Sequence, residues 1–131
     1  MAIQLSTALR NARLDQIETT IGTSAVLKIY TGSAPGVSNA VTGTLLATIT
    51  LPSDWMATAS GGSKALSGTW QATSAAASGT PGYARLFEST ATTGYIELDC
   101  AVGSGSLNFS ANISLGGTVT ISTFTLTDGN A

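Results

Sequence analysis

The sequence predicts an all-β protein, a two-sheet antiparallel sandwich that is jelly-roll-like or immunoglobulin-like, with one N-terminal α-helix. Among the 131 residues, 21 are Thr, 16 are Ser and 15 are Gly, which favour strands and turns. From about residue 25 onward, apolar residues recur at every second position, the period of a half-buried strand. Helical periodicity is confined to residues 6–21. We therefore expect a helical segment over residues 1–24, packing on the domain or on a partner, and a sandwich over residues 25–131.

The predicted helix has a start signal and a stop signal. Ser6 or Thr7 can cap its N-terminus, and Gly22 ends it. Its apolar surface is wide, which predicts contacts on more than one side. The apolar residues are Leu14, Ile17 and Ile21 on one side and Leu5, Leu9 and Ala12 on another.

The same helix carries four of the twelve charged residues of the chain, namely Arg10, Arg13, Asp15 and Glu18. Like charges lie three positions apart, and the basic half precedes the acidic half, against the preference of the helix dipole. These side chains therefore need partners outside the helix. Two alternatives stay open: a neighbouring subunit or larger assembly, or charged residues of the same domain, with Asp54, Glu88 or Glu97 as candidates for the arginines.

The first half of the predicted sandwich contains four strands. Residues 25–31 form the first, and residues 44–51 form the second, which Pro52 ends. Residues 64–72 and 82–89 flank a loop rich in Ala, Ser and Gly, which predicts a hairpin. The longer loops at 32–43 and 52–63 fit Greek-key crossovers.

Three further segments complete the pattern. Residues 94–102 place Ile96, Leu98, Cys100 and Val102 on one face. Residues 106–115 alternate strictly, which predicts inward side chains at Leu107, Phe109, Ala111, Ile113 and Leu115. In residues 117–129 the apolar positions change from odd to even, so we expect a β-bulge or a crossing between sheets near 122–123.

Composition excludes several classes of function. The net charge of −2 and five scattered basic residues argue against nucleic-acid binding, which needs a basic patch. No apolar run reaches the roughly 20 residues of a membrane span, and no secretory signal is evident. Without histidine, Ser–His–Asp and Cys–His catalysis and His-based metal sites are excluded. The lone Cys100 most simply packs as a small hydrophobic residue.

The remaining polar candidates have simple structural explanations. Glu97 and Asp99 share a strand face at a spacing that a two-carboxylate glycosidase could use. Nothing nearby indicates a cleft, however, and solvated side chains on an outer face are the ordinary explanation. Isolated Asp54, Asp99 and Asp128 lack the spacing of a calcium loop. Trp55 follows a strand-ending proline and is the best candidate for an exposed sugar platform, against the alternative that it fills the core. We therefore expect no enzyme activity, cofactor or metal.

Several stretches resemble small proteins encoded among the structural genes of tailed bacteriophages and prophages. The similarity covers about residues 5–90 and is most specific at "RNARLD" and "LPSDWM". Within this group, the small size, the sandwich and the Ser, Thr, Ala and Gly content resemble capsid decoration (cement) proteins.

The resemblance implies a non-enzymatic head decoration protein on the capsid surface, assembled in the bacterial host cytoplasm. Its partners would be the major capsid protein or another virion protein, and sister subunits in a homotrimer. A tail or neck component and a carbohydrate-binding module are the alternatives. The residues expected at the partner or oligomer interface are Arg10, Arg13, Leu14, Asp15, Ile17, Glu18 and Trp55.

Overall fold

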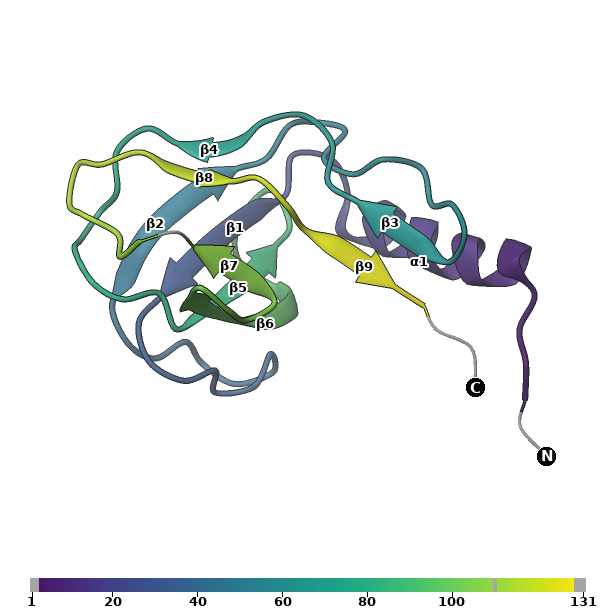
Figure 1. The fold of residues 1–131 in the computed structure, drawn as a ribbon, viewed down its shortest axis with the longest axis horizontal. Coiled ribbons are helices and arrows are strands. Elements are labelled where there is room, and N and C mark those ends of the chain that lie inside the picture. Colours follow the sequence, from purple (N-terminus) through teal and green to yellow (C-terminus); the bar gives the residue numbers. More distant parts are fainter. Residues whose placement is uncertain (1–2, 110, 129–131) are drawn as a thin grey trace.

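The computed structural model describes residues 3–109 and 111–128, and it contains one helix and nine strands (Figure 1). In chain order these are α1 (Thr7–Ile21), β1 (Val26–Tyr30), β2 (Leu45–Thr50), β3 (Ser63–Ala65), β4 (Trp70–Ala72), β5 (Tyr83–Phe87), β6 (Gly94–Val102), β7 (Leu107–Phe109), β8 (Val119–Ile121) and β9 (Thr125–Thr127). The prediction of a mostly β protein with one N-terminal helix is confirmed.

The strands form a small β-sandwich-like body and a side lobe. A five-stranded sheet has the order β2–β1–β5–β6–β7, antiparallel except for the parallel β6–β7 pair. The β4–β8 pair forms a second layer close to β2. The β3–β9 pair lies beside α1 and makes the lobe (Figure 1). The buried apolar residues that hold the two layers together are contributed by both, and they include Leu27, Ile29, Leu46, Ile49, Trp70, Leu86, Phe109 and Ile121.

Helix α1 begins and ends where its signals predict. The side chain of Ser6 accepts a hydrogen bond from the Leu9 amide at 3.2 Å, which identifies Ser6 as the N-cap. Gly22 follows the last turn at φ 91°, a conformation that side-chain-bearing residues rarely adopt, and its amide donates to the Glu18 carbonyl.

Two predicted strands are each divided. Residues 64–72 separate into β3 and β4, which belong to different sheets, with Gly68 at φ 72° between them. The predicted hairpin of 64–72 with 82–89 is therefore wrong, because β4 pairs with β8 while β5 pairs with β1 and β6. In the predicted strand over 106–115, regular pairing ends at Phe109, and Ala111 and Leu115 are exposed rather than inward. Residue 110 and residues 129–131 lie outside the described part.

The predicted crossing near residues 122–123 is confirmed. Val119 and Ile121 of β8 face the core from the second layer, where β8 pairs with β4. After residues 122–123 the chain enters β9, which pairs with β3 in the lobe. The apolar positions therefore change from odd to even at the point where the last segment leaves the sandwich and enters the lobe beside α1 (Figure 1).

Candidate functional site

The predicted interface residues of α1 lie in the lobe, where the helix meets β3. The acidic pair Asp15 and Glu18 surrounds the ammonium group of Lys64 in β3. Lys64 Nζ lies 2.7 Å from Asp15 Oδ1 and 3.0 Å from Glu18 Oε1, and it also donates to the Ala57 carbonyl at 2.9 Å. The Lys64 side chain is 1% exposed. A lysine this deeply buried requires such partners, so these contacts fix α1 on the two-stranded β3–β9 ribbon.

Both carboxylates also bind backbone. Asp15 Oδ1 accepts from the Ala59 amide at 3.0 Å, and Glu18 Oε2 accepts from the Met56 amide at 3.1 Å. Hydrogen bonds to Lys64 and Ala59 lower the pKa of Asp15. Burial by itself would lower the pKa of Lys64, but its bonds to Asp15 and Glu18 raise it above the usual value. Both shifts favour the charged forms of Asp15 and Lys64 around neutral pH.

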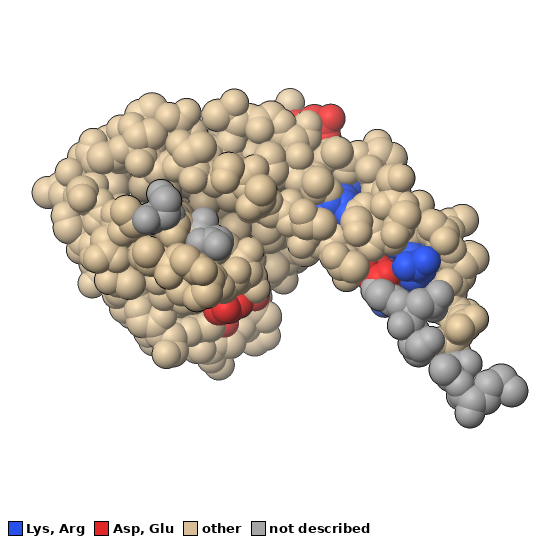
Figure 2. All heavy atoms as spheres, in the orientation of Figure 1, with Lys and Arg blue, Asp and Glu red and all other residues tan. Residues whose placement is uncertain are grey.

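The basic residues of α1 hold the end of β9. Arg10 donates through Nη1 to the carbonyl oxygen of Asp128 at 3.1 Å, and Arg13 Nε lies 3.2 Å from Asp128 Oδ2. The alternative that these charges find partners in the same domain is borne out, although Asp128 takes the place of the expected Asp54, Glu88 or Glu97. Glu97 instead pairs with Arg85, and Glu88 accepts from Thr90, Thr92 and Thr93. Charges gather over this lobe, while the face of the sandwich shown in Figure 2 is almost uncharged.

Two residues expected at a partner interface are inside the protein. Leu14 is 3% exposed and Trp55 is 0% exposed. The indole of Trp55 donates to the Gly22 carbonyl at 2.9 Å and lies 6.0 Å from the ring of Trp70. Trp55 therefore joins the end of α1 to the core, which corrects its assignment both as an interface residue and as a sugar platform.

The exposed part of the predicted interface borders an apolar groove between α1 and β6. The groove has a volume of about 320 Å³ and is lined by Arg13, Gln16, Ile17, Thr20 and Ile21 of α1 and by Tyr95 and Ile96 of β6. Tyr95 sits at a β-bulge, because Leu86 pairs with Ile96 whereas Phe87 pairs with Gly94. Bulges redirect side chains, and the Tyr95 side chain is 42% exposed here.

The outer face of the five-stranded sheet holds a second, buried ion pair. Arg85 binds Glu97 through Nε at 3.0 Å and also donates to the carbonyls of Asn39 and Gly36. Glu97 Oε1 accepts from the Gly36 amide at 2.7 Å. Through these bonds to Arg85 and to the Gly36 amide, Glu97 fixes the loop between β1 and β2. Asp99 instead accepts from Ser106, so the two acids do not form the carboxylate pair that a glycosidase would need.

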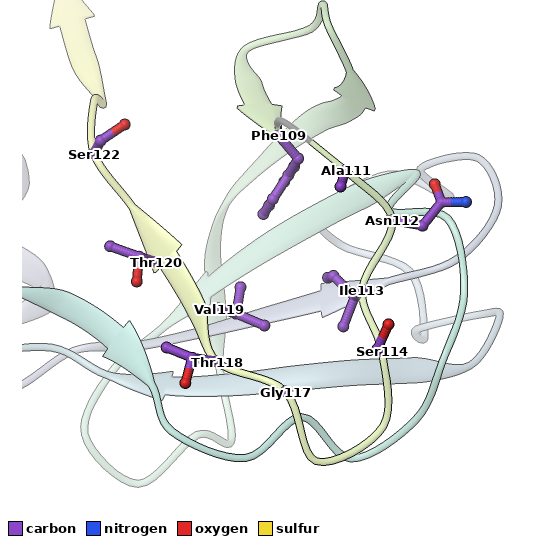
Figure 3. Close-up of a pocket in the computed structure, with 10 residues that line it drawn as sticks. All are labelled: Phe109, Ala111, Asn112, Ile113, Ser114, Gly117, Thr118, Val119, Thr120 and Ser122. Carbon is purple, nitrogen blue, oxygen red and sulfur yellow. The ribbon is translucent and has the colours of Figure 1, made fainter.

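Two further hollows differ in their linings. One, of about 480 Å³, lies between β8 and the segment after β7; Figure 3 shows Phe109, Ile113 and Val119 at it, together with Ser, Thr and Asn side chains. None of the described residues that line it is titratable, so these residues offer no acid or base. The other, of about 650 Å³, lies over the outer sheet face beside Lys28, whose ammonium group is 5.4 Å from the centre of the Phe87 ring.

Other candidate chemistry is weak in the described residues. Burial raises the pKa of Cys100 to about 12, so its thiol stays protonated and unreactive at neutral pH. No group of three or more His, Cys, Asp or Glu residues within 3–109 and 111–128 is placed to hold a metal ion. In that same part of the chain, no helix has the length and apolar character needed to cross a membrane.

Sequence reasoning missed the two residues that complete the helix contacts, Lys64 and Asp128. Lys64 falls at a position where residues 64–72 were expected to form one regular strand, and Asp128 reads as part of a turn. The excess of unpartnered charge on α1 was the available signal, because a buried helix face requires opposite charges from other segments. Comparison of the chain with protein-family models, curated proteins and solved structures finds no match.

Proposed function

We propose that this protein is a non-enzymatic structural component of a tailed-bacteriophage virion, a head decoration protein that binds and reinforces the capsid surface. The sequence resemblance around "RNARLD" and "LPSDWM" supports it, as does the small β-sandwich-like body, for which the jelly-roll arrangement is part of the proposal. The observation that carries the proposal is the apolar groove between α1 and β6, which lies beside residues expected at an interface and which we take as the contact surface.

The proposed occupant of the groove is a second copy of this chain. The groove is apolar and its charged lining residue is Arg13, whose side chain is 57% exposed although it contacts Asp128. On the sandwich, Asp99 is exposed and makes no ion pair among the described residues. A head-to-tail contact between these opposite charges forms a ring where the rotation between copies closes, and the proposed homotrimer requires a threefold rotation.

The oligomeric state tests this surface. Light scattering of the wild-type protein should give three times the mass of the chain, and Tyr95→Ser should lower it by removing the aromatic group at the groove. Val102→Ser is a matched control, because Val102 lies on the same strand with the same 42% exposure but away from the groove. A wild-type monomer, or equal loss in both variants, would reject the groove as the contact.

The position of the protein on the phage particle distinguishes a head decoration protein from a tail or neck component. Repeated weak contacts across a shell raise the effective affinity of a decoration protein, whereas a tail or neck component occupies a few positions on the particle. Cryo-electron microscopy of intact particles distinguishes the two. The burial of Trp55 removes the feature on which a carbohydrate-binding module was based.

A further inference from the structure

Lys64 and Asp15 bring together the two functional groups of an amide bond. The Lys64 amine is shielded from solvent, and its Nζ atom lies 2.7 Å from Asp15 Oδ1. A second carboxylate, that of Glu18, lies 3.0 Å from the same nitrogen. We propose that Lys64 and Asp15 condense after folding to form an intramolecular isopeptide bond, with Glu18 as the group that moves the proton.

The step balances without another reactant. A proton passes from Lys64 Nζ to the Asp15 carboxylate, which gives a neutral amine and a carboxylic acid. The nitrogen lone pair attacks Asp15 Cγ and forms the new C–N bond. Glu18 accepts the second proton from Nζ and returns it to the departing hydroxyl, which leaves as water when the C–O bond breaks. One positive and one negative charge disappear, and Glu18 ends in its starting state.

Neighbouring groups favour this reaction. The Ala59 amide, 3.0 Å from Asp15 Oδ1, stabilises the negative charge that develops on that oxygen in the tetrahedral intermediate. The Met56 amide fixes Glu18 through its other oxygen. The Asp15 side chain is 42% exposed, which lets the released water reach solvent.

Proximity lowers the barrier to this condensation. Free amines and free acids condense very slowly in water, but well-oriented groups within one molecule react with effective molarities of about 10⁵–10⁸ M. Because the ion pair favours the charged forms, the reactive neutral pair is a minor population. The bond should therefore form slowly in the folded protein rather than during folding.

The bond would tie α1 to β3 across 49 residues of sequence. The helix and the β3–β9 ribbon would then be unable to separate even when the surrounding hydrogen bonds open. This property suits a protein under mechanical load, but the chemistry does not depend on the proposed virion role, and its test is independent of that role.

Intact-mass spectrometry of the purified, aged wild-type protein tests the bond. The expected mass is lower than the mass calculated from the amino-acid sequence by the mass of one water molecule. The chain contains only two lysines, so the tryptic map is simple: cleavage after Lys64 should be blocked, and peptide 14–28 should remain attached to peptide 29–85. A full sequence mass together with normal cleavage after Lys64, in folded protein aged at mildly acidic, neutral and mildly basic pH, would overturn the proposal.

Variants identify the reacting groups. Lys64→Arg keeps the positive charge but should abolish the mass loss, whereas Lys28→Arg should leave it unchanged. Asp15→Asn should still react, with loss of ammonia in place of water, and Glu18→Gln should slow the reaction. A mass loss that persists in Lys64→Arg would assign it to other residues and reject the Lys64–Asp15 bond. If Lys64→Arg does not fold, the wild-type tryptic map decides between the two outcomes.

Discussion

Replacing Arg85 by methionine removes the cation that holds the β1–β2 loop on the outer face of the sheet. Arg85 is 4% exposed, and the Glu97 side chain is 8% exposed. The substitution keeps an unbranched apolar chain in place of the arginine stem. It leaves Glu97 buried without its counter-ion and leaves the Asn39 carbonyl without its side-chain donor, while the Gly36 carbonyl still accepts from the Asn39 amide.

The expected loss of stability is large because both charges are buried. Removing one partner of a buried ion pair costs about 3–5 kcal/mol. Unfolding entropy scales with chain length, so for a chain of this size each kcal/mol lowers Tm by about 3–4 °C, and the total shift is about 9–20 °C. The double variant Arg85→Met with Glu97→Gln should be less destabilised than Arg85→Met, since it leaves no buried unpaired charge.

Thermal and urea unfolding of the two single variants and the double variant measure these differences as a double-mutant cycle. Hydrogen exchange should show that the amides of residues 36 and 42 lose protection in Arg85→Met, because both depend on the attached loop. A loss below about 1 kcal/mol, or strictly additive effects in the double variant, would refute the assignment of this pair as the anchor of the loop.

Three further predictions concern single groups. Hydrogen bonds from Thr side chains and backbone amides lower the pKa of Glu88 to about 2, below its ordinary value of 4.5. The contribution of Glu88 to stability is therefore complete above about pH 5 and is lost as the pH falls towards 2. Unfolding of the wild type and of Glu88→Gln, measured over this pH range, should show the difference. Cys100 should resist alkylation in the native protein at pH 8 and react once the protein is unfolded, whereas rapid native labelling would contradict its burial. Gly43→Ala should lower Tm more than Gly32→Ala, since both have positive φ but a Cβ atom at Gly43 would lie 2.2 Å from the Thr31 carbonyl oxygen; equal Tm values would contradict that close approach.

The local features of the fold were predictable because they depend on neighbouring residues. The caps of α1, the alternation in β6 and the phase change near residue 122 each follow from the identity of a few adjacent residues. Pairing was harder, because a short strand such as β4 carries no information about its partner β8, which lies far along the chain. Strict alternation after Phe109 also predicted more strand than forms, since exposure of Ala111 and Leu115 depends on tertiary surroundings.

The helix charges show the same limit at the level of the site. Their spacing correctly indicated that Arg13 and Glu18 need partners beyond the helix. It could not identify Lys64 or Asp128, because those contacts require β3 and β9 to meet in the lobe. Burial of Trp55 likewise depends on the position of the α1–β1 connection, whose Gly22 carbonyl accepts its indole hydrogen.

Cryo-electron microscopy of virions assembled in cells that express this protein tests the proposed role most directly. We expect density for the sandwich and its helical lobe to be repeated over the capsid surface, with the α1–β6 groove of each copy occupied by a neighbouring copy. Particles that lack this density on the head, or that carry it only at the tail or neck, would contradict the assignment as a decoration protein.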